Sequence, residues 1–342
     1  MKSDKLTILL VLKGRHKFTD RWLSFANNFL SNYKIIIADG SEENKKYILD
    51  KKKYKNLEIK LPNFPYDENI EFFINKIRNS LKLIDTEYVL YCENDDFMFP
   101  DEIKNVLIFL QDNKDYVAGR GEIFNFSISS IDEIYGKIIE FKRFNEYLPL
   151  NEDDVFERLN SYSKNRHGLF HNITKKTALE KMLDGAIKNK FFDLVIFQYY
   201  WNFFLPLTGK IYCSKNLYML HQDHFNMISK NSNVMSFEKS FFYEESVFNN
   251  FFLKLADEIK NEHNIEIDKA KSKILSFFSY NELLKLISRN NEKNSSFKKL
   301  IINRMRDHKL SNFMLNYKKR FAINNNVLFS KKIKLIQDFL TK

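Results

Sequence analysis

The feature that most constrains the fold is a short apolar run that ends in clustered polar and acidic residues. Residues 88–92 (YVLYC) are followed at once by Glu93, Asn94, Asp95 and Asp96. A continuous apolar run of this length is typical of a strand buried on both faces of a parallel sheet. Ligands of open α/β sheets bind at the carboxyl ends of such strands, so the acidic residues are predicted to lie at a binding site.

The chemistry of this acidic group favours a metal ion. Crowded carboxylates repel one another unless a hard cation neutralises them, and Mg²⁺ or Mn²⁺ suits such oxygen ligands. Phosphate is the usual further ligand of a cation held in this way, so we interpret the group as a metal–diphosphate site. The alternative is that Asp95 and Asp96 only begin the next helix, since acidic residues favour helix N-termini.

The order of segments around this strand predicts an α/β fold. Residues 6–12 (LTILLVL) and 35–38 are further apolar runs, and both they and residues 57–61 are expected to form strands. Apolar residues at helical spacing follow the first run, and a helix is expected over about 69–84, before the run at 88. Strands that alternate with helices indicate a Rossmann-like, mostly parallel sheet that is flanked by helices.

The C-terminal third differs from the rest in charge. Residues 1–225 hold 33 Lys and Arg against 32 Asp and Glu, whereas residues 226–342 hold 22 against 12. Helical periodicity dominates from about residue 236. We therefore predict two domains, a nucleotide-binding and catalytic domain over 1–229 and a basic α-helical domain over 230–342.

Two basic amphipathic segments in this C-terminal region leave its role open. Residues 310–321 end in Lys318, Lys319 and Arg320, and residues 331–340 combine three lysines with Ile333, Ile336, Phe339 and Leu340. Such segments can lie on anionic lipid, or they can pack as a helical bundle with a solvated basic face. Basic charge also suits nucleic acid, but no recognised binding motif accompanies it, so no nucleic-acid partner is expected.

Composition also predicts the compartment. The early apolar run has seven residues, which suits a strand better than a secretory leader. No apolar stretch approaches the roughly 18 residues that a membrane span needs. Two cysteines imply no disulfide framework. We predict a soluble cytoplasmic protein, with a peripheral contact at the inner face of the membrane as an open alternative.

Several short motifs resemble those of the GT-A fold glycosyltransferases, particularly the family 2 type. Arg78-Asn79 stands where that family has an Ala-Arg-Asn helix, and Asp85-Thr86-Glu87-Tyr88 resembles its Gly-Glu-Tyr lead-in. Asn94-Asp95-Asp96 begins sixteen residues after Arg78, where the family has Asp-x-Asp, and Asp39-Gly40-Ser41 resembles its base-binding Asp-x-Ser. A bacterial subgroup named only as glycosyltransferase domain proteins is similar in its Cys-x-Asp-Asp-Asp-Phe motif. The resemblance covers residues 6 to about 225 and implies a GT-A fold.

The sequence departs from the family pattern at three places. Lys13-Gly14-Arg15 replaces the Pro-x-Tyr-Asn turn, the glycine after Arg-Asn is missing, and Asn94 replaces the first acidic residue. The terminal Gln-x-x-Arg-Trp of processive polysaccharide synthases is also absent. The resemblance therefore implies transfer of one sugar from a nucleotide-diphosphate-sugar donor to a glycan or lipid-linked acceptor, as in polysaccharide biosynthesis.

The resemblance also implies a metal centre. Asp96, with Asp95 beside it, would hold Mn²⁺ or Mg²⁺, and His221 or His224 would complete the metal shell. A cation there would neutralise the charge that grows on the leaving diphosphate. The alternative for either histidine is an ordinary hydrogen-bonded structural role.

Further residues are expected to contact the nucleotide sugar. Asp39 would accept a hydrogen bond from the base, and Arg78 would lie near the base or the phosphates. The remaining candidates for nucleotide-sugar contacts are Lys13, Arg15, Ser41, Asn94 and Asp95. The alternatives are a turn aspartate for Asp39, a surface helix arginine for Arg78 and a solvated loop for residues 13–15.

An inverting transferase needs a base to take the proton of the acceptor hydroxyl. Asp193 is the first candidate, because it precedes a helix at the point where family 2 enzymes place a Glu-Asp pair, and His171 is the second. The alternative for Asp193 is the N-cap of the helix that follows it. Rival functions are nucleotidyl transfer, whose glycine-rich loop matches residues 13–16 poorly, and a non-enzymatic basic protein that binds membrane or nucleic acid.

Overall fold

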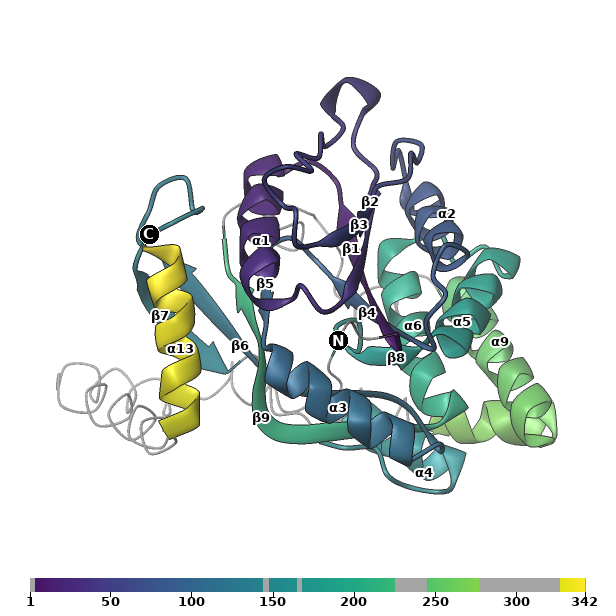
Figure 1. The fold of residues 1–342 in the computed structure, drawn as a ribbon. Coiled ribbons are helices and arrows are strands. Elements are labelled where there is room, and N and C mark those ends of the chain that lie inside the picture. The colour runs from purple at the N-terminus through teal and green to yellow at the C-terminus, as the bar shows by residue number, and fades with distance from the viewer. Residues whose placement is uncertain (1–3, 144–147, 165–167, 225–244, 277–326, 342) are drawn as a thin grey trace, which may run out of the picture.

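The computed structural model describes residues 4–143, 148–164, 168–224, 245–276 and 327–341, and it confirms the α/β class (Figure 1). The described strands are β1 (Leu6–Leu12), β2 (Lys34–Asp39), β3 (Glu58–Lys60), β4 (Tyr88–Cys92), β5 (Asp96–Met98), β6 (Tyr116–Ile128), β7 (Ile138–Arg143), β8 (Ile173–Lys175) and β9 (Lys210–Gln222). The described helices are α1 (His16–Phe29), η1 (Glu43–Lys45, a 3₁₀ helix), α2 (Ile70–Leu81), α3 (Pro100–Asp112), α4 (Val155–Lys164), α5 (Lys176–Lys188), α6 (Leu194–Thr208), α9 (Glu245–His263) and α13 (Val327–Leu340).

The described strands form one sheet, with the order β3-β2-β1-β4-β8-β6-β9-β5 and with β7 beside β6. The first four strands of this order pair in parallel, as the sequence predicts. β8 runs antiparallel to both β4 and β6, whereas β6 and β9 are again parallel. The carboxyl ends of β1, β2 and β4 therefore open on one edge of the sheet.

Helices cover both faces of the sheet (Figure 1). β1 is buried along its whole length because its alternate side chains face two cores. Leu9 and Val11 belong to the core that contains α2, α5, α6 and α9, whereas Ile8 and Leu10 belong to the core that contains α1, α3 and α13. This two-sided burial explains why the strand is a continuous apolar run.

The last helix, α13, packs into the second of these cores. Ile336 is fully buried, and the ring of Phe339 lies 5.6 Å from that of Phe25 in α1. Nζ of Lys332 is buried as well and donates a hydrogen bond to the carbonyl of Leu217 at 2.9 Å. The buried apolar residues of this helix pack against protein, and a membrane contact through its exposed lysines stays a prediction.

Two other predictions for the C-terminal third lie outside the described residues. The domain boundary near residue 230 lies within 225–244, and the cluster Lys318, Lys319 and Arg320 lies within 277–326. In α9, Phe251 and Phe252 are buried in the core that also contains α6. Within the residues that the structure describes, none of the helices is long and apolar enough to span a membrane.

Candidate functional site

Many of the predicted site residues lie at the carboxyl edge of the parallel strands. β1 leads into Lys13 and Arg15, β2 ends at Asp39, and β4 leads into the turn before Asp96. β5 then runs antiparallel to β9 and pairs with its carboxyl end. Asp96 therefore lies opposite His221 in the antiparallel register.

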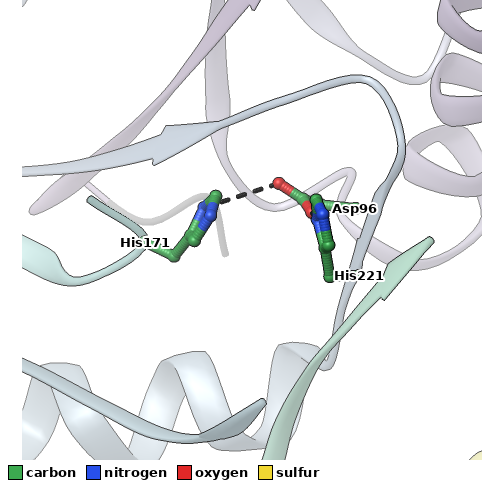
Figure 2. A group of neighbouring side chains, drawn as sticks. All are labelled: Asp96, His171 and His221. Atoms are coloured by element: carbon green, nitrogen blue, oxygen red, sulfur yellow. Dashed lines mark hydrogen bonds and ion pairs between the residues drawn. The ribbon is translucent and has the colours of Figure 1, made fainter. Parts of the chain in front are cut away.

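Asp96 lies between two histidine side chains (Figure 2). Its Oδ1 is 2.7 Å from Nδ1 of His221, and its Oδ2 is 3.5 Å from Nδ1 of His171. One possible ligand atom from each of the three residues lies within 4.8 Å of the other two. Asp96 has no exposed surface, and His221 is buried. We call these three residues the Asp–His–His group.

The Asp–His–His group fits a divalent transition ion. Imidazole nitrogens suit transition ions, whereas Mg²⁺ prefers an all-oxygen shell. Nδ1 of His171 is buried and has no hydrogen-bond partner among the described residues, which is the state expected of a nitrogen that can take a metal. Three protein ligands leave room for further ligands such as phosphate oxygens. His171, predicted as a second candidate base, is thus placed with the metal candidates.

Burial and charge shift the pKa values of the two histidines in opposite directions. Burial disfavours the charged ring of His221, but its hydrogen bond to Asp96 and the nearby acidic charges outweigh burial and raise its pKa to about 9. Burial lowers the pKa of His171, although the charge of Asp96 opposes this shift. His221 is therefore protonated at neutral pH, and a metal that binds its Nδ1 must displace a proton.

Asp95 does not belong to the Asp–His–His group, and its role as a second metal ligand stays a prediction. Its Oδ2 accepts a hydrogen bond from Nη1 of Arg15 at 2.9 Å and lies 2.8 Å from Nε2 of His224. Burial opposes the charged carboxylate, but the hydrogen bond to His224 and the charge of Arg15 outweigh it and hold the pKa of Asp95 well below its ordinary value. Asp95 lies in the turn before β5 and Asp96 is the first residue of that strand, and the two carboxylates have different partners.

Hydrogen bonds through Ser41 join the ends of β1 and β2. The backbone N–H of Gly14 donates to Oγ of Ser41 at 2.7 Å, and that hydroxyl donates to Oδ1 of Asp39 at 2.6 Å. The other oxygen of Asp39 accepts from the backbone N–H of Tyr47 at 2.6 Å. Asp39 thus has the turn role that the sequence left open, and its contact with a base stays a prediction.

Asn94 fixes the start of α1. Its Nδ2 donates to the carbonyl of Arg15 at 3.2 Å and to Oγ1 of Thr19 at 3.0 Å. Arg15 precedes the helix with φ of 58°, a left-handed conformation that is uncommon for a residue with a side chain. The contact of Asn94 with a ribose stays a prediction.

Arg78 pairs with acidic side chains of α5. Its Nε and Nη2 donate to the carboxylate of Asp184 at 2.6 and 3.0 Å, and this bidentate pair links α2 to α5. Lys76, two residues earlier on α2, is the buried cation that faces the strand ends. Side chains two positions apart on a helix do not share a face, so Lys76 and Arg78 meet different partners, and the contact of Arg78 with a nucleotide stays a prediction.

Asp193 is the N-cap of α6. Its Oδ1 accepts from the backbone N–H groups of Val195 and Ile196 at 2.8 and 3.0 Å, and the residue is exposed. The capping alternative is therefore confirmed, and the role of Asp193 as a base stays a prediction.

Three residues at the site were given no role by the sequence. Glu93 follows β4, and burial together with the charges of Asp95 and Asp96 raises its pKa to about 7. Lys76 and Asp67 form a buried ion pair between α2 and the connection that precedes it. Glu93 could have been found from the sequence, because it belongs to the acidic cluster after residue 92. The Lys76–Asp67 pair could not, because it depends on tertiary packing.

Comparisons with known proteins find similarity only at the level of structure. No protein-family model matches the sequence, and no curated protein matches it. The similar solved structures include S. aureus TarS 1–349, at 14% identity and a TM-score of 0.49, covering 81% of this chain and 71% of that chain. They also include the TarS 1–349 complex with UDP, at 13% identity and a TM-score of 0.49, covering 80% of this chain and 70% of that chain. The complex with UDP-GlcNAc has 13% identity and a TM-score of 0.45, covering 79% of this chain and 71% of that chain. The function proposed for this chain therefore rests on its own motifs and site geometry.

Proposed function

We propose that the protein is a metal-dependent glycosyltransferase of the GT-A type. It would move one sugar from a nucleotide-diphosphate-sugar donor to a hydroxyl of a glycan or lipid-linked acceptor, with inversion at the anomeric carbon. The observation that carries the proposal is the Asp–His–His group at the edge of the sheet where β1 and β2 also end. The order of the family-like motifs along the sequence supports the same reaction.

The residues of the site divide the work of transfer. Asp96, His171 and His221 would hold the cation, and a cation there would neutralise the charge that grows on the leaving diphosphate. As the bond between the anomeric carbon and the diphosphate breaks, the acceptor hydroxyl attacks that carbon and gives its proton to a base. Asp193 stays the predicted base, because His171 is placed with the metal candidates.

The ends of β1 and β2 would bind the nucleotide part of the donor. Lys13 is exposed and Arg15 is partly exposed, so both cations can reach phosphate oxygens. The turn of Asp39 and Ser41 would face the base. These proposed contacts would put the phosphates between the turn and the Asp–His–His group.

A peripheral membrane contact would depend on few described residues of α13. Lys331 and Lys334 are exposed, whereas Lys332 is buried in the fold. A cytoplasmic transferase that uses a lipid-linked acceptor would meet the inner face of the membrane, where exposed lysines favour anionic lipid. This contact stays a prediction.

The experiment that tests the function is donor consumption by the purified protein. We would incubate it with a panel of nucleotide-diphosphate sugars and Mn²⁺ and measure release of the nucleotide. We expect turnover of at least one donor, loss of turnover with a chelator, and a fall of about a hundredfold or more in Asp96→Ala with unchanged circular dichroism.

Asp85→Ala is the matched control for Asp96→Ala. Asp85 is an exposed aspartate whose ion pair with Lys34 lies at the amino end of β2, and its loss should leave turnover unchanged. Full activity in Asp96→Ala would discard the site. Release of pyrophosphate from a nucleoside triphosphate, without sugar transfer, would instead establish the rival nucleotidyl transfer.

A further inference from the structure

A buried ion pair lies below the ends of β1 and β2. The side chains of Lys76 in α2 and Asp67 in the β3–α2 connection are 1% and 4% exposed. Nζ of Lys76 also donates a hydrogen bond to the carbonyl of Leu12, the last residue of β1, at 2.9 Å. A buried ion pair is on balance no more stabilising than well-packed apolar residues, so stability alone does not explain its presence.

Asp67 contacts the ends of both strands. Its backbone N–H donates to the carbonyl of Gly40 at 2.9 Å, and its own carbonyl accepts a hydrogen bond from Nζ of Lys13. Its carboxylate packs directly on Gly40, where an added Cβ would lie 2.0 Å from Oδ2. Asp67 therefore sets the spacing between residue 13 after β1 and residue 40 after β2.

Lys76 is the group that holds the carboxylate of Asp67 in this place. Oδ2 of Asp67 accepts from Nζ of Lys76, whereas Oδ1 is buried and has no hydrogen-bond partner among the described residues. Burial lowers the pKa of Lys76, and the charge of Asp67 opposes that shift. The pair is thus mutually dependent, because either charge alone would be buried without compensation.

We infer that Asp67 and Lys76 are positioning residues for the nucleotide part of the donor, an inference that rests on the proposed function. They hold Lys13 and the Asp39–Ser41 turn at the spacing that the nucleotide requires, and they need not touch the donor. Among the described residues, Asp67 and Lys76 hydrogen-bond to Lys13, Leu12, Gly40 and each other, and not to the Asp–His–His group. Nucleotide binding and metal binding should therefore respond differently to loss of the pair.

The test removes both charges at once. Lys76→Met alone leaves the carboxylate of Asp67 unpaired, so its melting temperature should fall by several degrees. The double variant Asp67→Asn/Lys76→Met should melt close to wild type, because no unpaired charge remains. We expect this double variant to bind UDP at least about tenfold more weakly by calorimetry, with the affinity for Mn²⁺ alone unchanged by electron paramagnetic resonance.

The matched control is the exposed pair Lys34–Asp85, which joins the amino end of β2 to residues before β4. The double variant Asp85→Asn/Lys34→Met should bind both UDP and Mn²⁺ as wild type does. Gly40→Ala is an independent variant, since its Cβ would displace Asp67 without changing Lys76, and it should also weaken UDP binding about tenfold.

The outcomes separate this inference from the proposed function. Wild-type UDP affinity in Asp67→Asn/Lys76→Met overturns the inference alone, and if that variant does not fold, wild-type affinity in Gly40→Ala does so. A wild-type protein that binds none of UDP, CDP, GDP and ADP overturns both the inference and the proposed function. Weaker UDP binding together with retained Mn²⁺ affinity and melting temperature supports both.

Discussion

Two buried carboxylates at the same edge of the sheet have opposite surroundings. Asp67 faces the ammonium group of Lys76, whereas Asp96 faces the imidazole rings of His221 and His171. Lys76 pairs with the carboxylate of Asp67 and fixes it, whereas a histidine can release its proton to make way for a metal ion. The comparison teaches that a carboxylate paired with lysine can hold neighbouring backbone in place. A carboxylate beside histidines can instead exchange the histidine proton for a metal ion.

The largest expected effect is on metal binding and tests whether the histidines beside Asp96 are metal ligands. His221→Ala and His171→Ala should each weaken Mn²⁺ binding by about a hundredfold, because each removes one of three protein ligands. Titration followed by electron paramagnetic resonance would measure this change.

The matched histidine control is His263→Ala in α9, whose Nε2 hydrogen-bonds the carbonyl of Leu207 at 2.9 Å. It should bind Mn²⁺ as wild type does. If His171→Ala also keeps wild-type affinity, the group is reduced to Asp96 and His221, and the three-ligand interpretation is wrong.

A smaller effect is expected on the pH dependence of the free energy of unfolding, and it tests whether His221 exchanges its proton. The pKa of His221 is raised from 6.5 to about 9 in the folded, metal-free protein. Its contribution to the free energy of unfolding is therefore full below about pH 6.5 and is lost as pH rises through 9, with a total on the order of a few kcal/mol. Urea unfolding with a chelator at pH 6.5 and 9.5 would measure the loss.

His221→Ala should flatten this pH dependence. With Mn²⁺ present the trend should reverse, since fewer protons compete for the metal at high pH. An equal loss of stability in wild type and His221→Ala would show that another group titrates.

The smallest expected effect concerns the exposed carboxylate of Asp193. Asp193→Asn should keep the cap of α6 and change the free energy of unfolding by only a few tenths of a kcal/mol, whereas Asp193→Ala should lose about 1 kcal/mol. Urea unfolding measures both values. A transfer rate that falls about a hundredfold in Asp193→Asn at unchanged stability would establish the base role, and an unchanged rate would leave Asp193 as a cap only.

Features fixed by local sequence were predictable. The apolar runs at residues 6–12 and 88–92 are strands that are buried on both faces. The carboxylates that follow 88–92 lie at the sheet edge because that strand ends at Cys92. Asp96 and His221 were both named as metal candidates, and the structure pairs them through β5 and β9.

Features fixed by tertiary packing were not predictable. Nothing in the sequence near Asp95 shows that Arg15, eighty residues earlier, neutralises it. Arg78 and Lys76 are equally plausible cations on one helix until the packing of α2 decides which of them faces the strand ends. The grouping of His171 with Asp96 likewise depends on the position of the segment before β8.

The seating of α13 has a practical consequence for anyone who shortens the chain. Rings of Phe25 and Phe97 rest against Phe339, and the carboxylate of Asp101 pairs with Lys332 at 2.9 Å. A fragment that ends before residue 327 would expose the apolar surface around Phe25 and Phe97 to water, and this exposure favours self-association. Helix α13 covers part of the core that contains α1 and α3, so the amino-terminal two thirds of the chain should be expressed together with this helix.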